Sequence, residues 1–366
     1  MTRMDTDKKM DIRVHPCDPW FIISCAVVRV IAHDELLRNT VQQMTAPNTY
    51  PASWYPLCRT RDVPRNSLKQ INAFDAQLIV FRNASNTVGA MAARCPHMGA
   101  SLARGRIVGD CVQCPLHHWQ FGADGRCTHI PNVSSATHPI PKNAAVRALH
   151  CEEHYGLVWA FLGDAPSFEF PLMRDADRWF TRAFILDFDT PYQVFTSNSF
   201  DVQHFVTVHH RELLEPPVAV NESPHHIGLK FRAKVLGAEW HDRLLRTIGV
   251  RTVELEGHCW GSSILFGYNA RTHMRTLLAV LPEKVQRTRV FVVSALAKHT
   301  APKLPQPIRR VMLGIAHGFT LAFLKNDIAV ARDLQFKPGT LLPDLDQHYI
   351  AWVQYWQKLP RVDSFS

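Results

Sequence analysis

Two short segments of the sequence each offer one thiolate and one imidazole, and together they could hold a pair of iron atoms. Cys95 and His97 are separated by one residue, and Cys114 and His117 by two, with turn-forming proline or glycine residues beside both pairs. Mixed pairs of this kind suit a [2Fe–2S] cluster in which one iron takes two thiolates and the other takes two imidazoles. A zinc site is the alternative, but its usual pairs are Cys–Cys and His–His with wider spacing.

The segment CPHMGA…CPLHHWQF resembles the Rieske domain of the Rieske non-heme iron oxygenases. SWYPLC at 53–58 is similar to the start of that domain, and the resemblance covers roughly residues 53 to 360. Respiratory Rieske proteins carry a further cysteine in each ligand loop, and Ala100 and Leu116 stand at those places here. The resemblance therefore implies a low-potential cluster. Three nearby side chains are expected to be bystanders: Cys111, His118 and Cys127.

An oxygenase also needs a second metal, and two histidines with one carboxylate leave open positions on Fe(II) for O2. NSFDVQHFVTVHHREL places Asn198, Asp201 and His204 at steps of three, on one face of a predicted helix. In a regular helix, His209 would be rotated by about 140° from His204, which lies five residues earlier. The two can therefore share an ion only if the helix ends or bulges between them. The N-x-x-D-x-x-H-x4-H pattern is similar to the family's iron site, which implies His204 and His209 as ligands, with His210 as the competitor of His209.

The carboxylate ligand must come from a distant segment. A helix predicted over about 306–336 carries an apolar stripe: Met312, Ile315, Phe319 and Phe323. Asp327 continues this stripe at i+4 and would lie on its buried face, where a carboxylate is costly unless it is paired or bound to a metal. KNDIAVARDLQF also resembles the family segment that contains the carboxylate ligand. Asp333 lies about 120° off the stripe and is expected to be solvated.

The resemblance further implies a homotrimer. In it, Asp201 lies between the mononuclear iron of one subunit and a Rieske histidine of the next, and hydrogen-bonds histidine ligands of both sites. Asn198 makes a weak outer contact near the iron. Because the sequence contains neither G-x-G-x-x-G after a strand nor a flavin signature, we expect electrons from a ferredoxin or an NAD(P)H-dependent reductase.

The elements that must position these residues form an α+β pattern. Short apolar segments alternate with turns between residues 54 and 163, which is typical of an all-β domain. The later part combines a helical segment near 196–210 with predicted strands at 228–238, 250–256, 263–269, 275–282 and 287–295. We predict an N-terminal extension (1–50), an all-β Rieske domain (51–165) and a catalytic domain (166–366) with an antiparallel sheet and helices of the helix-grip type.

The composition is that of a globular protein. Of the 366 residues, 46% are hydrophobic, and no apolar run approaches the ~18 residues that cross a bilayer, so stable membrane insertion is not expected. The nine cysteines are scattered, which is unlike a secreted disulfide framework, and we expect a cytoplasmic protein. The net charge of +9 without a dense basic run argues against nucleic acid and favours an acidic protein partner.

Together these features predict a terminal oxygenase that uses O2 and external electrons. A small hydrophobic substrate is expected, because the catalytic half is rich in Phe and Leu and lacks a cluster of Arg or Lys. The segment GDCVQCPLHHWQFGADGRCTHIP resembles both the steroid hydroxylase and sterol desaturase branch and the arylamine N-oxygenase branch. We therefore expect monooxygenation or desaturation of a ring-containing secondary metabolite or steroid, with arylamine N-oxygenation as the alternative. An electron carrier without catalysis is the alternative from another class.

Overall fold

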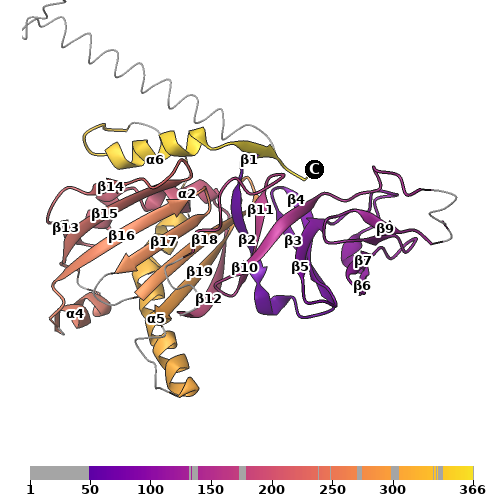
Figure 1. Cartoon of the computed structure of the whole chain (residues 1–366). Helices are drawn as coiled ribbons and strands as arrows, with labels where there is room; N and C mark the ends of the chain where they lie inside the picture. Colours follow the sequence, from indigo (N-terminus) through magenta and orange to yellow (C-terminus); the bar gives the residue numbers. More distant parts are fainter. Residues whose placement is uncertain are drawn as a thin grey trace, which may run out of the picture. The chain divides into compact units, whose positions relative to one another are not determined.

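The described chain divides its strands between a small all-β region and one large antiparallel sheet (Figure 1). The computed structural model describes residues 49–131, 133, 139–172, 179–237, 239–247, 249–269, 274–297, 305–332, 334, 336 and 341–365. They belong to a unit that runs from Ala46 to Ser366. The predicted extension over residues 1–50 lies outside the described residues, except for its last two.

The all-β region contains a six-stranded sheet and a smaller four-stranded one. The six strands follow the order β2 (Ser53–Arg59), β11 (Leu157–Leu162), β10 (Ala148–His154), β5 (Val88–Ala92), β4 (Ala76–Arg82) and β3 (Ser67–Ala73). The four strands are β6 (Arg106–Val108), β7 (Cys111–Gln113), β8 (Gln120–Phe121) and β9 (Cys127–His129). Two short 3-10 helices, η1 (Thr60–Asp62) and η2 (Leu102–Arg104), complete the region. A core that includes Ile79, Phe81, Met91 and Phe121 also encloses Cys95 and Cys114, so the thiols are mounted on packed structure.

The large sheet is antiparallel throughout and has eight strands among the described residues. Its order is β12 (Trp179–Phe188), β19 (Arg287–Ala297), β18 (Met274–Lys284), β17 (Ile264–Asn269), β16 (Thr252–Trp260), β15 (His226–Val235) and β13 (Arg211–Leu213), while β14 (Val218–Val220) also pairs with β15. The five predicted strands are β15 to β19, with ends that differ by a few residues. The sequence analysis did not predict β12, β13 or β14.

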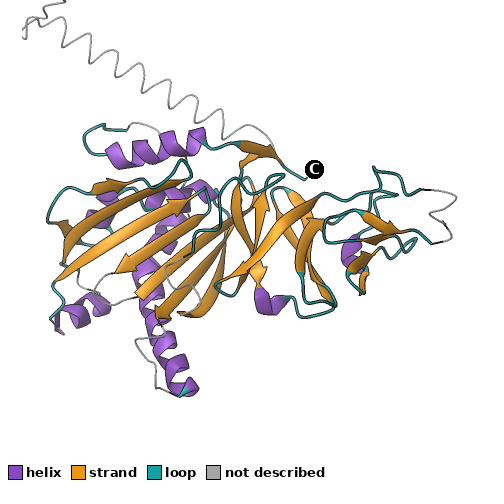
Figure 2. Ribbon diagram, in the orientation of Figure 1, coloured by secondary structure: helices purple, strands orange, loops and turns teal. Residues whose placement is uncertain are grey.

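Helices lie against this sheet, and the long helix α5 (Gln306–Ala331) packs on β19 and β12 (Figure 2). The predicted α+β class is therefore confirmed. The shorter helices are α2 (Tyr192–Asn198), α3 (Val202–Thr207), α4 (Trp240–Thr247) and α6 (Gln347–Lys358). The terminal strand β20 (Arg361–Asp363) pairs with β1 (Thr49–Pro51). No helix in the described ranges is both long and apolar enough to cross a membrane.

Two expectations about helices were wrong. The single helical segment near 196–210 is two short helices. The helix is interrupted because Asp201 has an extended backbone and is the N-cap of α3. The predicted stripe of α5 is not one buried face, since Ile315 is 58% exposed. Different faces of α5 contact the sheet, α4 and α3, so a single stripe could not describe its packing. The side chain of Met312 and the whole of Asp333 lie outside the described residues.

Candidate metal centres

The four predicted cluster ligands meet at the tips of two loops. In the first loop the Gly99 N–H donates to the Cys95 carbonyl at 2.9 Å, and in the second the Cys114 N–H donates to the Trp119 carbonyl at 2.8 Å. These turns bring Nδ1 of His97 to 3.1 Å from Nδ1 of His117. Both thiols are buried while both imidazoles are exposed. The site therefore presents an inner thiol pair and an outer imidazole pair, which fits a [2Fe–2S] cluster with mixed ligands.

The protein supports each half of this ligand group differently. Burial raises the pKa of the Cys95 thiol to about 11, while backbone N–H groups of His97 and Met98 donate to the sulfur and oppose the rise. N–H···S bonds of this kind also tune the potential of a bound cluster. The ring of His97 stacks on Trp119 with centroids 4.6 Å apart, which holds the outer imidazole.

The expected bystanders stand apart from this ligand group. Cys111 Sγ lies 3.3 Å from the Thr128 hydroxyl, and Cys127 Sγ donates to the His129 carbonyl at 3.5 Å. His118 adopts φ +56° directly after His117. The two cysteines thus contact residues other than the four predicted ligands.

A second ligand group forms where α3 meets α5. Nε2 of His204 lies 3.1 Å from Nε2 of His209, and Oδ1 of Asp327 lies 2.5 Å and 3.0 Å from these two nitrogens. Ligand atoms at right angles around a first-row metal, each about 2.1 Å from it, are themselves about 3 Å apart. Both histidines are buried and the Asp327 side chain is only 15% exposed. The three side chains therefore fit one face of a six-coordinate ion.

The end of helix α3 explains how two histidines five residues apart can converge. The helix stops at Thr207, so His209 no longer follows the helical rotation that would carry it about 140° away. His210 takes φ +50° and is exposed, outside the ligand group. Of the two adjacent histidines, the structure thus brings His209 to the site.

Asp201 and Asn198 flank His204 from two different elements. The Asp201 Oδ1 accepts the backbone N–H of His204 at 3.0 Å, which makes Asp201 the N-cap of α3. Asn198 Nδ2 lies 3.4 Å from His204 Nε2, at the end of α2. Both residues line a cavity of about 220 Å³ that Asp346 and Tyr349 also line. The carboxylate of Asp201 thus lies beside the backbone of His204 and lines a cavity.

The charge at the site comes from Asp327. Burial alone would raise the pKa of its carboxyl, but the hydrogen bonds from His204 and His209 more than offset this and lower the pKa below its usual value. A carboxylate that stays ionised beside two imidazoles is suited to a divalent cation.

Two supports of His209 were missed by the sequence analysis. The ring of Phe323 stacks on His209 with centroids 4.1 Å apart and planes 7° from parallel. The Arg211 guanidinium donates to the His209 carbonyl at 2.7 Å and to Asp242 at 2.7 Å. The helical spacing of Phe323 was visible in the sequence, but nothing in it pairs Arg211 with Asp242.

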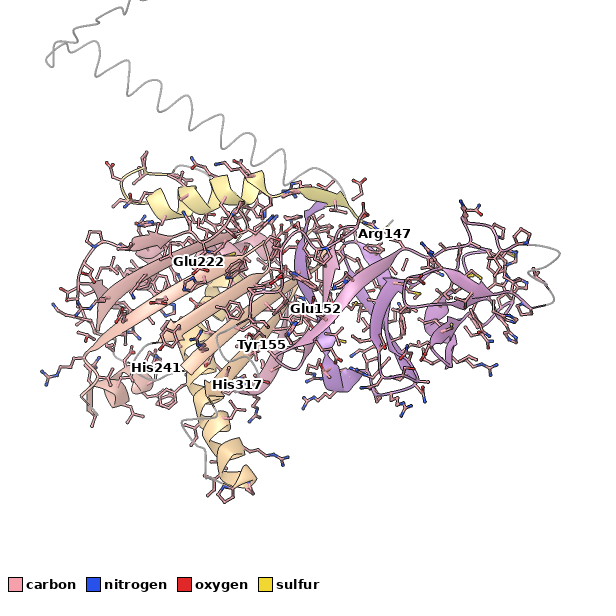
Figure 3. The ribbon with its side chains drawn as sticks, in the orientation of Figure 1. Arg147, Glu152, Tyr155, Glu222, His241 and His317 are labelled. Atoms are coloured by element: carbon pink, nitrogen blue, oxygen red, sulfur yellow. The ribbon has the colours of Figure 1, made fainter. Side chains whose placement is uncertain are left out.

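A third group with metal-binding side chains comprises Glu222, His226 and His258 (Figure 3 labels Glu222). The Glu222 N–H donates to Nδ1 of His226 at 3.0 Å, so the neutral ring carries its proton on Nε2. That proton points to Nδ1 of His258, 3.0 Å away. The two imidazoles therefore satisfy one another, and His226 has no free lone pair to offer a metal.

Comparison with known proteins agrees with the geometry of the first centre. Residues 53–155 match the family of the Rieske [2Fe-2S] domain. The whole fold is similar to a solved structure of dicamba monooxygenase with non-heme iron and dicamba, with a TM-score of 0.65 and 19% identity over 84% of this chain and 96% of that one. Residues 53–155 thus form a Rieske domain, the chain shares the fold of dicamba monooxygenase, and the resemblance predicted from the sequence is confirmed.

Two curated proteins match parts of the sequence. The chain is 32% identical over 166 residues to aminopyrrolnitrin oxygenase PrnD of Pseudomonas fluorescens, which is 43% of this chain and 46% of that protein. It is 31% identical over 175 residues to cholesterol 7-desaturase nvd of Bombyx mori, which is 46% of this chain and 37% of that protein. The matches thus span less than half of the length of these relatives.

Proposed function

We propose that this protein is the terminal oxygenase of a Rieske-type system, which uses O2 and externally supplied electrons to oxidise a hydrophobic, ring-containing substrate. The observation that carries the proposal is the buried group of His204, His209 and Asp327 in a chain that also has a Rieske domain. A protein that only carries electrons has no use for a second ligand group with open positions.

The bound metals would supply one-electron transfer at the cluster and O2 activation at the mononuclear iron. The chain's own residues would hold and orient them. His204, His209 and Asp327 would bind the iron, and three protein ligands would leave it able to take up O2. The Asp201 cap fixes the first turn of α3, and with it the backbone of His204.

The helix-facing side of the large sheet offers room for a flat apolar substrate. A Cβ on Gly257 would meet no heavy atom of the described residues within 4 Å, and one on the paired Gly267 would meet only the Thr276 carbonyl, at 3.9 Å. These positions share a face with Phe231, which packs on Phe205 of α3 with centroids 4.9 Å apart. Open space beside the ligand-bearing helix supports a ring system as substrate.

Monooxygenation or desaturation of a steroid or secondary metabolite is the reaction we favour, and N-oxygenation of an arylamine is the second candidate. The similarity to cholesterol 7-desaturase nvd supports the first and that to aminopyrrolnitrin oxygenase PrnD supports the second. Incubation with a steroid ketone and with an arylamine, followed by mass spectrometry, separates them. A gain of oxygen on carbon indicates monooxygenation, a loss of two hydrogens from carbon indicates desaturation, and a gain of oxygen on nitrogen indicates N-oxygenation.

We also propose a homotrimer in which Asp201 links the iron of one chain to His97 or His117 of a neighbouring copy. The exposure of both imidazoles and the cavity beside Asp201 support this arrangement. Electrons would reach the cluster from a ferredoxin or reductase with an acidic surface, which the net charge of +9 favours. The cytoplasmic location stays a prediction.

Metal analysis tests the proposal directly. The anaerobically purified chain should hold about three iron atoms, two in the cluster and one at the second centre, and should give a Rieske electron-resonance signal after reduction. Two irons without a third would indicate an electron carrier. A colourless protein with stoichiometric zinc would contradict both assignments.

A further inference from the structure

We propose that Arg211 and Asp242 are positioning residues for His209 and that they set the affinity of the mononuclear iron site. This inference rests on the proposed iron site. The residues lie on separate elements, since Arg211 begins β13 and Asp242 lies in the first turn of α4.

His209 needs outside support because no helix holds it. Helix α3 ends at Thr207. His210, which directly follows His209, adopts the left-handed φ of +50°. This conformation is uncommon for a residue other than glycine. The backbone around His209 therefore lies outside the helical ladder that fixes His204. It is held by contacts with other segments, one of which is the Leu236 N–H that donates to the His210 carbonyl at 3.1 Å.

Arg211 supplies a side-chain contact to the backbone of His209 itself. Its Nη1 donates to the His209 carbonyl at 2.7 Å, while its Nη2 donates to Asp242 Oδ1 at 2.7 Å. Both side chains of the pair are only 3% exposed. Because a buried guanidinium without its carboxylate is strongly unfavourable, Asp242 holds Arg211 in place, and Arg211 in turn holds His209.

Two further features suit the same arrangement. A Cβ on Gly237 would lie 1.8 Å from Oδ2 of Asp242, so only glycine leaves room for this carboxylate. The ring of Phe323 covers the His209 imidazole, and the Arg211 guanidinium carbon lies 5.7 Å from the centre of that same ring. His209 is thus held at its carbonyl by Arg211 and at its ring by α5, the helix that carries Asp327.

The geometry requires arginine rather than a generic cation. The planar fork directs two separate N–H groups, one at a carbonyl and one at a carboxylate. Lysine at this position could pair with Asp242, but its single ammonium cannot keep both bonds in this geometry. Arg211→Lys therefore separates the charge of the pair from its contact to His209.

The test measures metal binding in the full chain. Co(II) is titrated into the iron-depleted second centre of Arg211→Lys, Asp242→Asn and the double variant Arg211→Met/Asp242→Leu. The double variant removes the buried charges together, which keeps the fold more readily than removing one of them. The cluster's visible spectrum reports folding. The control is Arg82→Lys, which alters the ion pair of the buried Arg82 with the partly exposed Glu153 at 2.6 Å, far from the second ligand group in the sequence.

We expect the three variants to bind Co(II) about 10- to 100-fold more weakly than the wild type, with an altered Co(II) absorption spectrum, because outer contacts of metal ligands have effects of this size. Arg82→Lys should lower the melting temperature without changing Co(II) affinity. Wild-type Co(II) affinity in the folded double variant would overturn the inference. If a charge-removing variant does not fold, Arg211→Lys decides in the same way.

One further variant distinguishes this result from failure of the proposed function. If wild type and His204→Ala bind Co(II) equally, the assigned iron site is wrong. If His204→Ala loses binding while all variants of the Arg211–Asp242 pair retain it, the iron site stands and only the positioning role is refuted.

Discussion

Asp201→Asn is the variant that separates a structural role of Asp201 from a role in electron transfer. Asp201 caps α3 by accepting the His204 N–H at 3.0 Å. Asparagine is as good an N-cap as aspartate, so this variant should change the stability by no more than about 0.5 kcal/mol. Asp201→Ala loses the cap and should cost about 1 kcal/mol, or about 2 °C in melting temperature. What both variants lose is the negative charge beside the iron ligand.

The assay is a single turnover. The cluster is reduced in advance, O2 and a converted substrate are added, and re-oxidation of the cluster is followed by absorbance. We expect Asp201→Asn to hold both metals yet re-oxidise about 10- to 100-fold more slowly, since the proposed charge-assisted bonds to histidine side chains would be lost.

A neighbouring carboxylate provides the matched control. Asp346 lines the same cavity and accepts hydrogen bonds from Gln203 and from the Leu342 N–H, both at 2.7 Å. Asp346→Asn should therefore re-oxidise at the wild-type rate. Wild-type kinetics in Asp201→Asn would refute the bridge, and equal slowing in both variants would show that the cavity's charge, rather than Asp201 itself, matters.

Three other outcomes are expected. His204→Ala or Asp327→Ala should remove the mononuclear iron and product formation while the Rieske spectrum stays intact; a full complement of iron in either would contradict the ligand assignment. Gly267→Val should raise KM for a fused-ring substrate about 10-fold or more, because the added methyl groups enter the open space, whereas the exposed Gly318→Ala should not. Burial lowers the pKa of His226 to about 4, so the unfolded chain takes up a proton near pH 6.5 that the folded chain resists. The stability from neutral His226 is thus present above about pH 6.5 and declines toward pH 4. Between these pH values, the melting temperature of His226→Phe should fall less than that of the wild type.

The ligand residues could be predicted because their patterns are local. A Cys-x-His or Cys-x-x-His loop brings its own two side chains together whatever surrounds it, and the structure completes the group through Nδ1 atoms 3.1 Å apart. Asp327 does lie beside His204 and His209, although the stripe that suggested it is partly exposed. Phe323 and Asp327 do share a face of α5, but that face meets His209 and His204 rather than the sheet.

The supports of the second centre could not be predicted, because they depend on contacts between distant segments. Arg211 and Asp242 are separated by 31 residues, and neither has a spacing that marks it as other than a surface charge. The interruption between α2 and α3 could not be predicted either, because the sequence keeps a helical spacing from Asn198 through Asp201 to His204. Helix α2 ends at Asn198, Asp201 caps the start of α3, and α3 ends at Thr207, so the chain can turn before His209. A regular helix through this segment would have placed the two histidines on different faces, so a single helix and two converging imidazoles could not both hold.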